Sequence, residues 1–291
     1  LGCRDVIGGI NWVKSIAPEG DVVKKVEKGK SQFAGHEMLG RKLGVIGLGA
    51  VGGPLANAAQ RLGMEVYGCD PFISIDAAWH LDSQITRVNR REDVFSTCDI
   101  ISLHTPLLDD TRKMINAETI ATMKDGVIIL NFARDLLVDD DAMAEALSSG
   151  KVARYVTDFP NDKTASMPGC IAIPHLGAST EESEDNCAKM AVAEMMNYLE
   201  NGNIRRSVNL PDMVMDRSGV ERLCILHKNV PGMLANITSL FGRDGVNVEN
   251  LSNKSRGDYA YTIVDLSAPA DQCVIDEVTA LENVIRVRVI Q

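Results

Sequence analysis

Short apolar runs alternate with stretches of helical periodicity through the middle of the chain. Each run has the length and the branched aliphatic content of a strand, and the runs cover residues 43–46, 65–69, 99–103, 127–130, 154–157 and 171–173. The stretches between them predict helices, such as one over residues 139–149 that starts with acidic residues and stops at Gly150. Strands that alternate with helices build βαβ units, so the sequence predicts an α/β fold with a doubly wound parallel sheet.

The pattern changes towards the C-terminus. A long helix is expected over residues 180–200, with Thr180 at its start and Gly202 after its end. A polar, irregular segment follows, and we expect residues 211–219 to link two domains. Beyond it the pattern is strand 220–226, helix 233–243, strands 246–252 and 258–266, helix 271–280 and strand 284–290. This βαββαβ unit is small, so a partner copy would help its stability and we expect a homo-oligomer, at least a dimer.

Composition narrows the class of protein. With 291 residues, 45% of them hydrophobic, the chain can bury the cores of about two domains. A net charge of −10 without a basic stripe argues against nucleic acid as a partner. The seven cysteines are scattered singly, without metal-ligand spacing, so we expect reduced thiols in a cytoplasmic protein and no metal. No apolar run approaches the ~20 residues of a membrane span.

The first 40 residues do not predict a complete domain. They offer one helix-like run and a polar stretch, and Leu1 is not an initiator methionine. We therefore expect that part of a domain precedes Leu1.

A glycine-rich turn follows the first strand of the sheet. Residues 47–52 read GLGAVG, match the GxGxxG pattern and open a helix expected over residues 53–62. Such glycines permit a tight turn and let the backbone approach a pyrophosphate at the helix N-terminus. The alternative is a turn that only packs well, but Asp70 ends the second strand at the spacing expected for a ribose ligand. Asp70 would repel a 2′-phosphate, and neither Pro71 nor Phe72 can bind one, so NAD is favoured over NADP.

Polar residues also follow the later strands, at the edge where doubly wound sheets bind ligands. They are the segments 104–106 and 131–134, Asp158, and the segment 174–179. Oxidation of a 2-hydroxy acid requires a base for the hydroxyl proton and a cation for the carboxylate, and His175 and Arg134 are the candidates. Each alone could be an ordinary residue at a strand end. His104 is expected only to shape the cofactor pocket.

Four motifs in order resemble the D-2-hydroxyacid dehydrogenase family, from about residue 2 to residue 206. They are GLGAVG at 47–52, LHTPL at 103–107 with Thr111, NFAR at 131–134, and PHLGAST at 174–180. The resemblance implies that Arg134 clamps the substrate carboxylate and that His175 exchanges the C2 hydroxyl proton. With the Rossmann-type turn, it assigns these residues to cofactor binding: Gly47, Gly49, Ala50, Val51, Gly52, Asp70, Thr105, Pro106, Thr111, Phe132, Ala133, Asp158, Gly177 and Ala178.

The sequence departs from the family pattern at two positions. In the family, the acid partner of the histidine follows an Asp-Val-Phe motif. Here the corresponding segment, TDFPND, is one residue shorter than the family pattern. Asp162 is the nearest equivalent, and as an aspartate it is one methylene shorter than the usual glutamate. Asp135 stands where the family usually has glycine, and its charge is expected to orient or weaken Arg134.

The C-terminal unit resembles an ACT domain from residue 220 to residue 291. Such domains bind small amino acids between paired copies, and in phosphoglycerate dehydrogenases the ligand is L-serine. His227, Asn229 and Asn247 match the serine contacts. The alternative is a domain that serves dimerisation only.

A 2-hydroxyacid dehydrogenase with an ACT domain is most similar to enzymes that oxidise 3-phosphoglycerate to 3-phosphohydroxypyruvate, the first step of serine synthesis. Other hydroxyacid dehydrogenases, acting on glycerate or lactate, are the alternative, and an NAD-sensing corepressor is a more distant one. The resemblance implies a dinucleotide domain over 1–175, a substrate-domain remnant over 176–210, the linker and an ACT domain over 220–291. Because we expect half of the substrate domain to be absent from these 291 residues, we also expect them to bind NAD but to turn over slowly.

Overall fold

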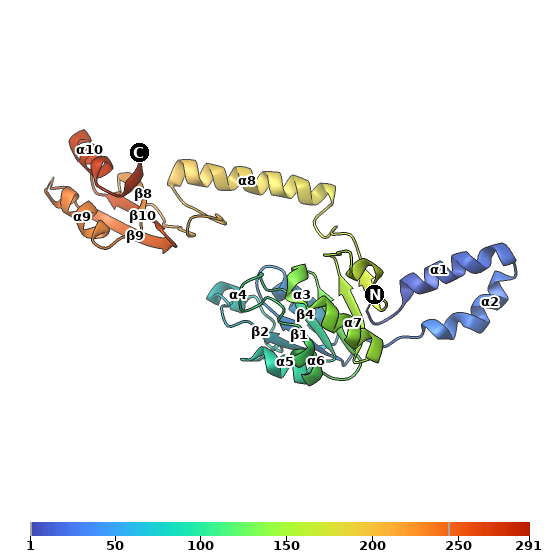
Figure 1. The fold of residues 1–291 in the computed structure, drawn as a ribbon. Coiled ribbons are helices and arrows are strands. Elements are labelled where there is room, and N and C mark those ends of the chain that lie inside the picture. The colour runs from blue at the N-terminus through green and yellow to red at the C-terminus, as the bar shows by residue number, and fades with distance from the viewer. Residues whose placement is uncertain (1, 244) are drawn as a thin grey trace. The chain divides into compact units, whose positions relative to one another are not determined.

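The computed structural model describes residues 2–243 and 245–291. It divides into two compact units, residues 1–177 and 178–291. Each unit has its own sheet (Figure 1). Each unit also has its own apolar core. The predicted fold class, a parallel sheet with helices followed by a separate βαββαβ unit, is confirmed.

The sheet of the first unit is parallel throughout, in the order β3-β2-β1-β4-β5-β6-β7. The strand order reverses between β1 and β4, and doubly wound sheets bind ligands at such a switch point. The six predicted strands are present, whereas β3 was missed because it has only two residues, both exposed. The strands are β1 (Lys42–Ile46), β2 (Glu65–Cys69), β3 (Thr86–Arg87), β4 (Ile100–Leu103), β5 (Val127–Asn131), β6 (Val152–Thr157) and β7 (Cys170–Ala172).

Helices connect these strands, and most of them bury apolar residues against the sheet. The last long one starts at Asp139, whose side chain accepts hydrogen bonds from the amides of Asp141 and Ala142, and it ends at Gly150 with φ of 78°. Both signals were read from the sequence. The elements are α3 (Gly52–Arg61), α4 (Ile75–Trp79), α5 (Arg91–Thr97), α6 (Ala117–Thr122), η3 (Asp135–Leu137), α7 (Asp140–Ser149) and η4 (Thr164–Ser166).

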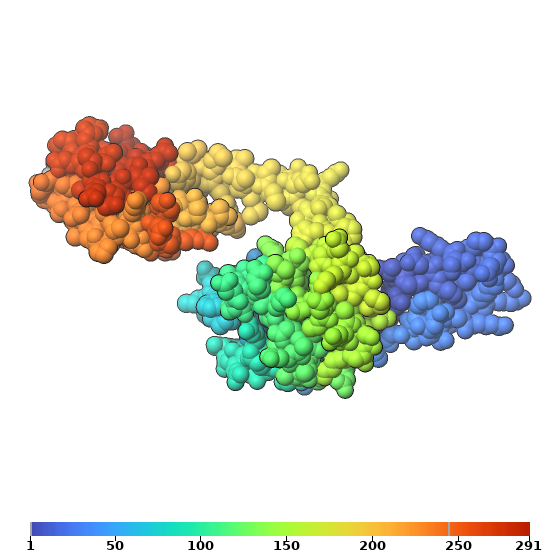
Figure 2. Space-filling view, viewed as in Figure 1, coloured from blue at the N-terminus to red at the C-terminus, as the bar shows by residue number. Residues whose placement is uncertain are grey.

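The N-terminal residues form a helical hairpin rather than the single helix expected. It consists of α1 (Val6–Ile16), η1 (Ala17–Glu19), α2 (Val22–Gly29) and η2 (Lys30–Phe33). The rings of Trp12 and Phe33 pack 5.3 Å apart and hold its two arms together. In the space-filling view this hairpin is a small lobe of the first unit, beside the packed body of the sheet and its helices (Figure 2).

The second unit begins with the long helix α8 (Glu181–Asn201). Its antiparallel sheet has the order β11-β8-β10-β9, as expected of a βαββαβ unit. Leu223 and Ile225 of β8 pack with the two helices on one face of the sheet. The elements are β8 (Glu221–Lys228), α9 (Met233–Arg243), β9 (Val248–Arg256), β10 (Tyr259–Leu266), α10 (Gln272–Ala280) and β11 (Val284–Ile290).

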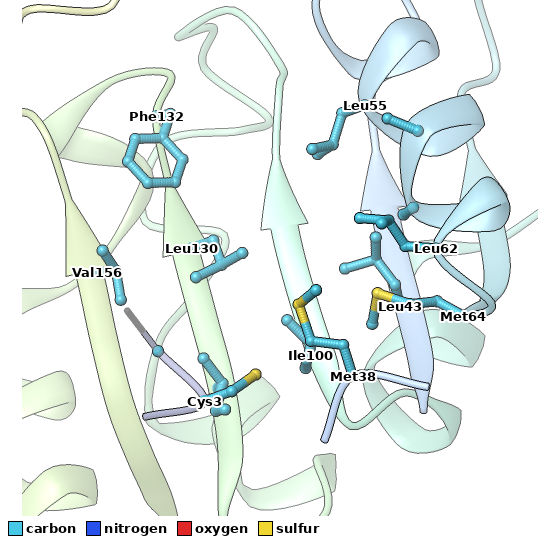
Figure 3. Close-up of a pocket in the computed structure, with 14 residues that line it drawn as sticks. Cys3, Met38, Leu43, Leu55, Leu62, Met64, Ile100, Leu130, Phe132 and Val156 are labelled. Carbon is cyan, nitrogen blue, oxygen red and sulfur yellow. The ribbon is translucent and has the colours of Figure 1, made fainter. Parts of the chain in front are cut away.

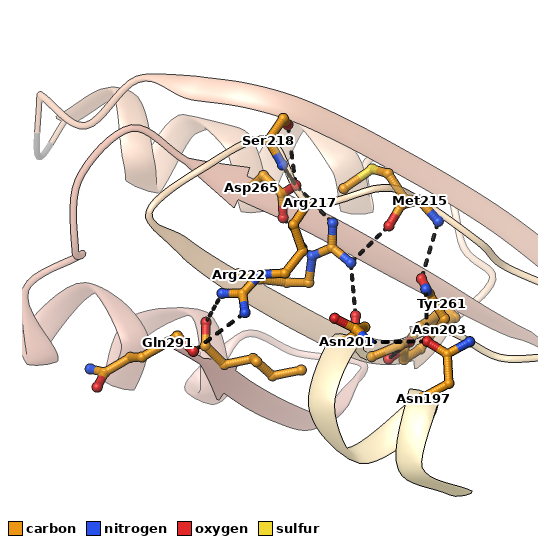
Figure 4. Close-up of polar contacts among 12 residues, drawn as sticks. Asn197, Asn201, Asn203, Met215, Arg217, Ser218, Arg222, Tyr261, Asp265 and Gln291 are labelled. Atoms are coloured by element: carbon orange, nitrogen blue, oxygen red, sulfur yellow. Dashed lines mark hydrogen bonds and ion pairs between the residues drawn. The ribbon is translucent and has the colours of Figure 1, made fainter. Parts of the chain in front are cut away.

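The segment between α8 and β8, which includes the expected linker at residues 211–219, is packed within the second unit. A bridge pairs Ile204 with Met213, and Met213 is fully buried in a cluster with Tyr261 on the second face of the sheet. Arg222 of β8 is also fully buried, and its guanidinium donates to the carbonyls of Asn201 and Met215 (Figure 4). Tertiary contacts therefore fix a segment whose composition indicated only an irregular chain.

Within the described residues, none of the helices combines the length and the apolar character that crossing a bilayer requires.

Candidate active site

The glycine-rich turn lies between β1 and α3, and two of its glycines are required by geometry. Gly47 has φ of 92°, and a Cβ there would lie 2.6 Å from the carbonyl oxygen of His104. A Cβ on Gly52 would lie 1.9 Å from the carbonyl oxygen of Gly47. Next to Gly49, by contrast, the space is open, and no side chain caps the N-terminus of α3. The turn thus leaves room for an anion at the first amides of α3.

Asp70 ties this turn to the end of β2. Its Oδ2 accepts a hydrogen bond from the Leu48 amide at 2.8 Å, and its Oδ1 accepts one from the Phe72 amide at 2.9 Å. Each carboxylate oxygen keeps a second lone pair for a ligand. Asp70 therefore shapes the turn as well as offering acceptors beside it.

A cavity of about 490 Å³ opens beside the turn. Six residues expected to bind the cofactor line it, and these are Gly47, Gly49, Asp70, Thr105, Pro106 and Thr111. Arg90 and Arg91 line it too, although no motif in the sequence marks them. Arg91 donates to the Asp110 carbonyl at 3.1 Å and pairs with Glu92. Their position just after β3 was the available signal, but β3 itself was missed.

The loop after β4 is held by its own side chains. The Thr111 hydroxyl donates to the Pro106 carbonyl at 2.7 Å and accepts from the Leu108 amide at 2.8 Å. His104 shares a hydrogen bond of 2.8 Å with Ser102, and burial lowers the pKa of His104 to about 4. His104 is therefore neutral at physiological pH, which fits the expectation that it shapes the pocket.

Asn131, at the end of β5, presents Arg134. It is fully buried, its Nδ2 donates to the Arg134 carbonyl at 2.8 Å, and its Oδ1 accepts from the Ala133 amide at 3.2 Å. The Arg134 guanidinium is exposed and donates to the Ala133 carbonyl at 2.6 Å. Asp135 instead accepts a hydrogen bond from the Leu136 amide, and in the described part of the chain no ion pair joins it to Arg134. The backbone at Arg134 is extended, so successive side chains point to opposite sides.

His175 lies against the dipeptide that follows β6. Its Nδ1 is 3.3 Å from Oδ2 of Asp158, and its ring meets the Phe159 ring edge-on at 4.6 Å. The His175 side chain is 62% exposed, whereas that of Asp158 is 10% exposed. Oδ1 of Asp158 is buried and has no hydrogen-bond partner. Because an orphaned buried acceptor costs about 1–3 kcal/mol, this oxygen marks a site for a ligand or water.

Asp162, expected as the acid partner of His175, is exposed and makes no contact with His175 among the described residues. The cause is a tight turn at Asn161, whose Oδ1 accepts from the amides of Lys163 and Thr164. That turn directs the chain away before Asp162 reaches the histidine. The carboxylate facing His175 is the one expected to bind the cofactor, Asp158.

Phe132, expected to bind the cofactor, lies outside the cavity beside the glycine-rich turn. It lines a second cavity of about 330 Å³, together with Leu55, Leu130 and Val156 (Figure 3). Apolar side chains make up nearly all of the lining of this cavity. Ala133 is buried, and neither residue lines the cavity beside the glycine-rich turn.

The remaining predicted cofactor residues are exposed. Ala50 and Val51 stand at the glycine-rich turn, and a Cβ on Gly177 would meet no other atom. Ala178 belongs to the second unit.

The three predicted serine contacts are not joined to one another in the second unit. His227 is 2% exposed, its Nδ1 donates to the Lys228 carbonyl at 2.8 Å, and its Nε2 shares a hydrogen bond with Thr262 at 2.9 Å. Asn229 and Asn247 are exposed on separate segments, where Asn229 donates to a carbonyl at 3.2 Å and Asn247 donates to a carboxylate at 3.2 Å.

Comparison with known proteins places this geometry in a family. Residues 9–177 match the D-isomer specific 2-hydroxyacid dehydrogenase, NAD binding domain, and residues 223–286 match the AHAS small subunit-like ACT domain. The chain is 32% identical to D-3-phosphoglycerate dehydrogenase of Haemophilus influenzae over 273 residues, 90% of this chain and 65% of the relative. It is 30% identical to D-3-phosphoglycerate dehydrogenase of Escherichia coli strain K12, covering 98% of this chain and 72% of the relative.

Two solved structures share the fold of the first part of the chain. A glyoxylate reductase from Paecilomyes thermophila has a TM-score of 0.54 and 26% identity, covering 64% of this chain and 58% of that chain. An NAD-complexed D-isomer specific 2-hydroxyacid dehydrogenase from Lactobacillus delbrueckii ssp. bulgaricus has a TM-score of 0.54 and 26% identity, covering 62% and 59%. The chain thus spans only part of these relatives' length. It belongs to the D-isomer specific 2-hydroxyacid dehydrogenase family, with that family's NAD binding domain followed by an ACT domain.

Proposed function

We propose that the chain oxidises 3-phosphoglycerate to 3-phosphohydroxypyruvate with NAD, the first step of L-serine biosynthesis. The proposal draws on the relatives named D-3-phosphoglycerate dehydrogenase, which match both units of the chain. The observation that carries it is the meeting of Arg134 and His175 on the Phe159 ring at the carboxyl end of the sheet, with Asp158 facing His175.

The residues present fit NAD. The open turn at Gly49 and the uncapped N-terminus of α3 suit the pyrophosphate, and Asp70 offers acceptors to the adenosine ribose. The orphaned Oδ1 of Asp158 offers an acceptor to an amide donor of the cofactor. When bound, the nicotinamide supplies the hydride acceptor.

His175 accepts the proton of the substrate hydroxyl. Because the Asp158 carboxylate faces Nδ1 at 3.3 Å, the proton is held on that side of the ring and the Nε2 atom is left as the base. The C2–H bond of the substrate breaks with its electron pair leaving as hydride, while the hydroxyl proton moves to Nε2 and the C2–O bond becomes a carbonyl. The buried Asp158 carboxylate stabilises the imidazolium that results. We propose Asp158 in this role in place of Asp162.

Arg134 holds the substrate. The substrate is an anion and the chain carries a net charge of −10, so a local cation must offset the surrounding field. Arg134 has no carboxylate partner among the described residues, so its charge and its donors remain for the substrate carboxylate.

A substrate panel tests the function. The initial rate of NADH formation is measured at saturating NAD with 3-phosphoglycerate, D-glycerate and D-lactate. We expect the highest kcat/KM with 3-phosphoglycerate. Preference for glycerate or lactate would assign the chain to another branch of the family, and no NADH with any of the three would contradict the proposal.

For the regulatory part, we propose that residues 220–291 bind L-serine and pair with a second copy. Asn229 and Asn247 supply exposed amide groups, and serine would replace the bond between His227 and Thr262. We propose further that residues 176–210 are a remnant of the substrate domain and that residues 211–219 link it to the ACT domain. Calorimetry with L-serine, glycine and L-alanine on wild type and Asn229→Ala tests the ligand, and sedimentation tests the dimer. No heat with any amino acid would leave dimerisation as the role of this domain.

A further inference from the structure

Phe159 lies between the two groups that would face the substrate. Its ring contacts the His175 ring with centroids 4.6 Å apart at an interplanar angle of 62°. The Arg134 guanidinium carbon lies 5.7 Å from the centroid of the same ring. One aromatic side chain therefore contacts both the base and the cation of the proposed reaction.

The backbone of Phe159 is itself well fixed. Its amide donates to the hydroxyl of Thr157 at 3.1 Å, and Thr157 is a fully buried residue of β6. Pro160 follows, which restricts Phe159 to extended backbone conformations. The ring is thus carried directly by the central sheet and is only partly exposed.

Arg134 and His175, by contrast, have few other anchors. Among the described residues, the Arg134 guanidinium has only the Ala133 carbonyl besides the ring. His175 has Asp158 besides the ring. A carboxylate in the place of Phe159 would hold the guanidinium equally well, but it would compete with the substrate carboxylate. An aromatic face attracts the cation by about 0.5–1 kcal/mol at such exposed sites and leaves its hydrogen-bond donors free.

We propose that Phe159 is a positioning residue that sets the spacing between the Arg134 guanidinium and the His175 imidazole. With that spacing, a single 2-hydroxy acid presents its carboxylate to one group and its C2 hydroxyl to the other. This inference rests on the proposed function. It goes beyond it, because neither the glycine-rich turn nor the family motifs assign a task to this ring.

The test compares Phe159→Leu with Phe159→Tyr, and uses Phe33→Leu as a matched control in the N-terminal hairpin. Phe159→Leu keeps the apolar volume but removes the aromatic face and edge. We expect kcat to fall roughly 10- to 100-fold and KM for the hydroxy acid to rise, because small displacements of reacting groups cost about that much. The NAD dissociation constant and the melting temperature should stay near those of wild type, and Phe159→Tyr should restore most of the rate.

The outcomes separate the inference from the function. If wild type forms NADH and Phe159→Leu does so equally fast, the positioning role is wrong while the function stands. If Phe159→Leu loses NAD affinity and melting temperature together and Phe159→Tyr gives no rescue, the ring is only structural and the inference fails. If wild type forms no NADH from any hydroxy acid, the proposed function fails, and the inference fails with it.

Discussion

Asp265 and Asp158 are both buried aspartates that face a basic side chain, yet their surroundings differ. Asp265 is 1% exposed and receives two bonds from the fully buried Arg222, at 2.6 and 2.8 Å, and two more from Ser218. Asp158 is 7% exposed and has one partner, His175 at 3.3 Å, while its second oxygen has none.

The difference suits a structural role for the Asp265–Arg222 pair and the catalytic role proposed for the Asp158–His175 pair. Burial alone would raise the pKa of Asp265, but the hydrogen bonds from Arg222 and Ser218 hold it below its ordinary value. That network is complete and joins the end of α8 to the sheet (Figure 4). In the pair of Asp158 and His175, one carboxylate oxygen lacks a partner and the histidine is exposed to solvent. Such a pair can accept a ligand and stabilise a transient charge.

The largest effect is expected at the incomplete pair formed by Asp158 and His175. His175→Gln removes the proposed base but keeps a polar side chain of similar size. Turnover should fall by roughly 10²- to 10⁴-fold, while the NAD dissociation constant stays near that of wild type. Steady-state kinetics with calorimetric NAD titration measure both, and retained turnover would remove His175 from the chemistry.

Arg222→Met tests the complete pair. It leaves the buried Asp265 carboxylate without its cationic partner, with only the Ser218 hydrogen bonds remaining, which should cost about 3–5 kcal/mol of the unfolding free energy of the second unit. The control is Arg206→Met, because Arg206 forms an exposed pair with Glu194 and should contribute at most about 1 kcal/mol. Denaturation followed with probes in each unit measures the difference. Equal losses in the two variants would refute the structural role.

Asp70→Ser should weaken NAD binding by roughly tenfold, because hydrogen bonds to a charged acceptor contribute about 1.5–3 kcal/mol. Binding of NADP should weaken less, since the charge that repels a 2′-phosphate is gone. Asp76→Ser on the exposed helix α4 is the control. Titration of NAD and NADP into wild type, Asp70→Ser and Asp76→Ser measures both affinities. An unchanged ratio of NAD to NADP affinity in Asp70→Ser would argue against the assignment of Asp70 to the ribose.

The smallest effect is a pH dependence. The pKa of His104 is about 4 in the fold, below the ordinary value of 6.5 expected in the unfolded chain. The unfolded chain therefore takes up the proton first, so the stability due to neutral His104 is present above pH 6.5 and is lost as pH falls towards 4. Between pH 7 and 5.5, wild type should lose about 1 kcal/mol more than His104→Asn. His80→Asn, at an exposed histidine, should behave as wild type.

Local signals made most of the fold predictable. Strand runs, the cap at Asp139 and the stop at Gly150 act over a few residues, so the sequence alone located the sheet and α7. The packed segment after α8 was not predictable, because its order depends on Arg222 and Tyr261, which lie far along the chain.

The candidate site also has a part that the sequence predicts and a part that it does not. The turn at Gly47 and the acid at Asp70 follow from motif spacing and stand together in the structure. The partner of His175 was not found, because one residue fewer in the loop and the turn at Asn161 decide which carboxylate faces the ring. Such a choice depends on side-chain geometry that spacing does not show.

The most direct test of the account is the turnover of Asp158→Asn beside Asp162→Asn. Both substitutions remove one charge from the same loop with little change in shape. The account predicts that Asp158→Asn lowers kcat by at least roughly tenfold, since its amide neither holds the right tautomer nor stabilises imidazolium, and that Asp162→Asn retains wild-type kcat. Wild-type turnover in Asp158→Asn, or an equal loss in Asp162→Asn, would contradict it.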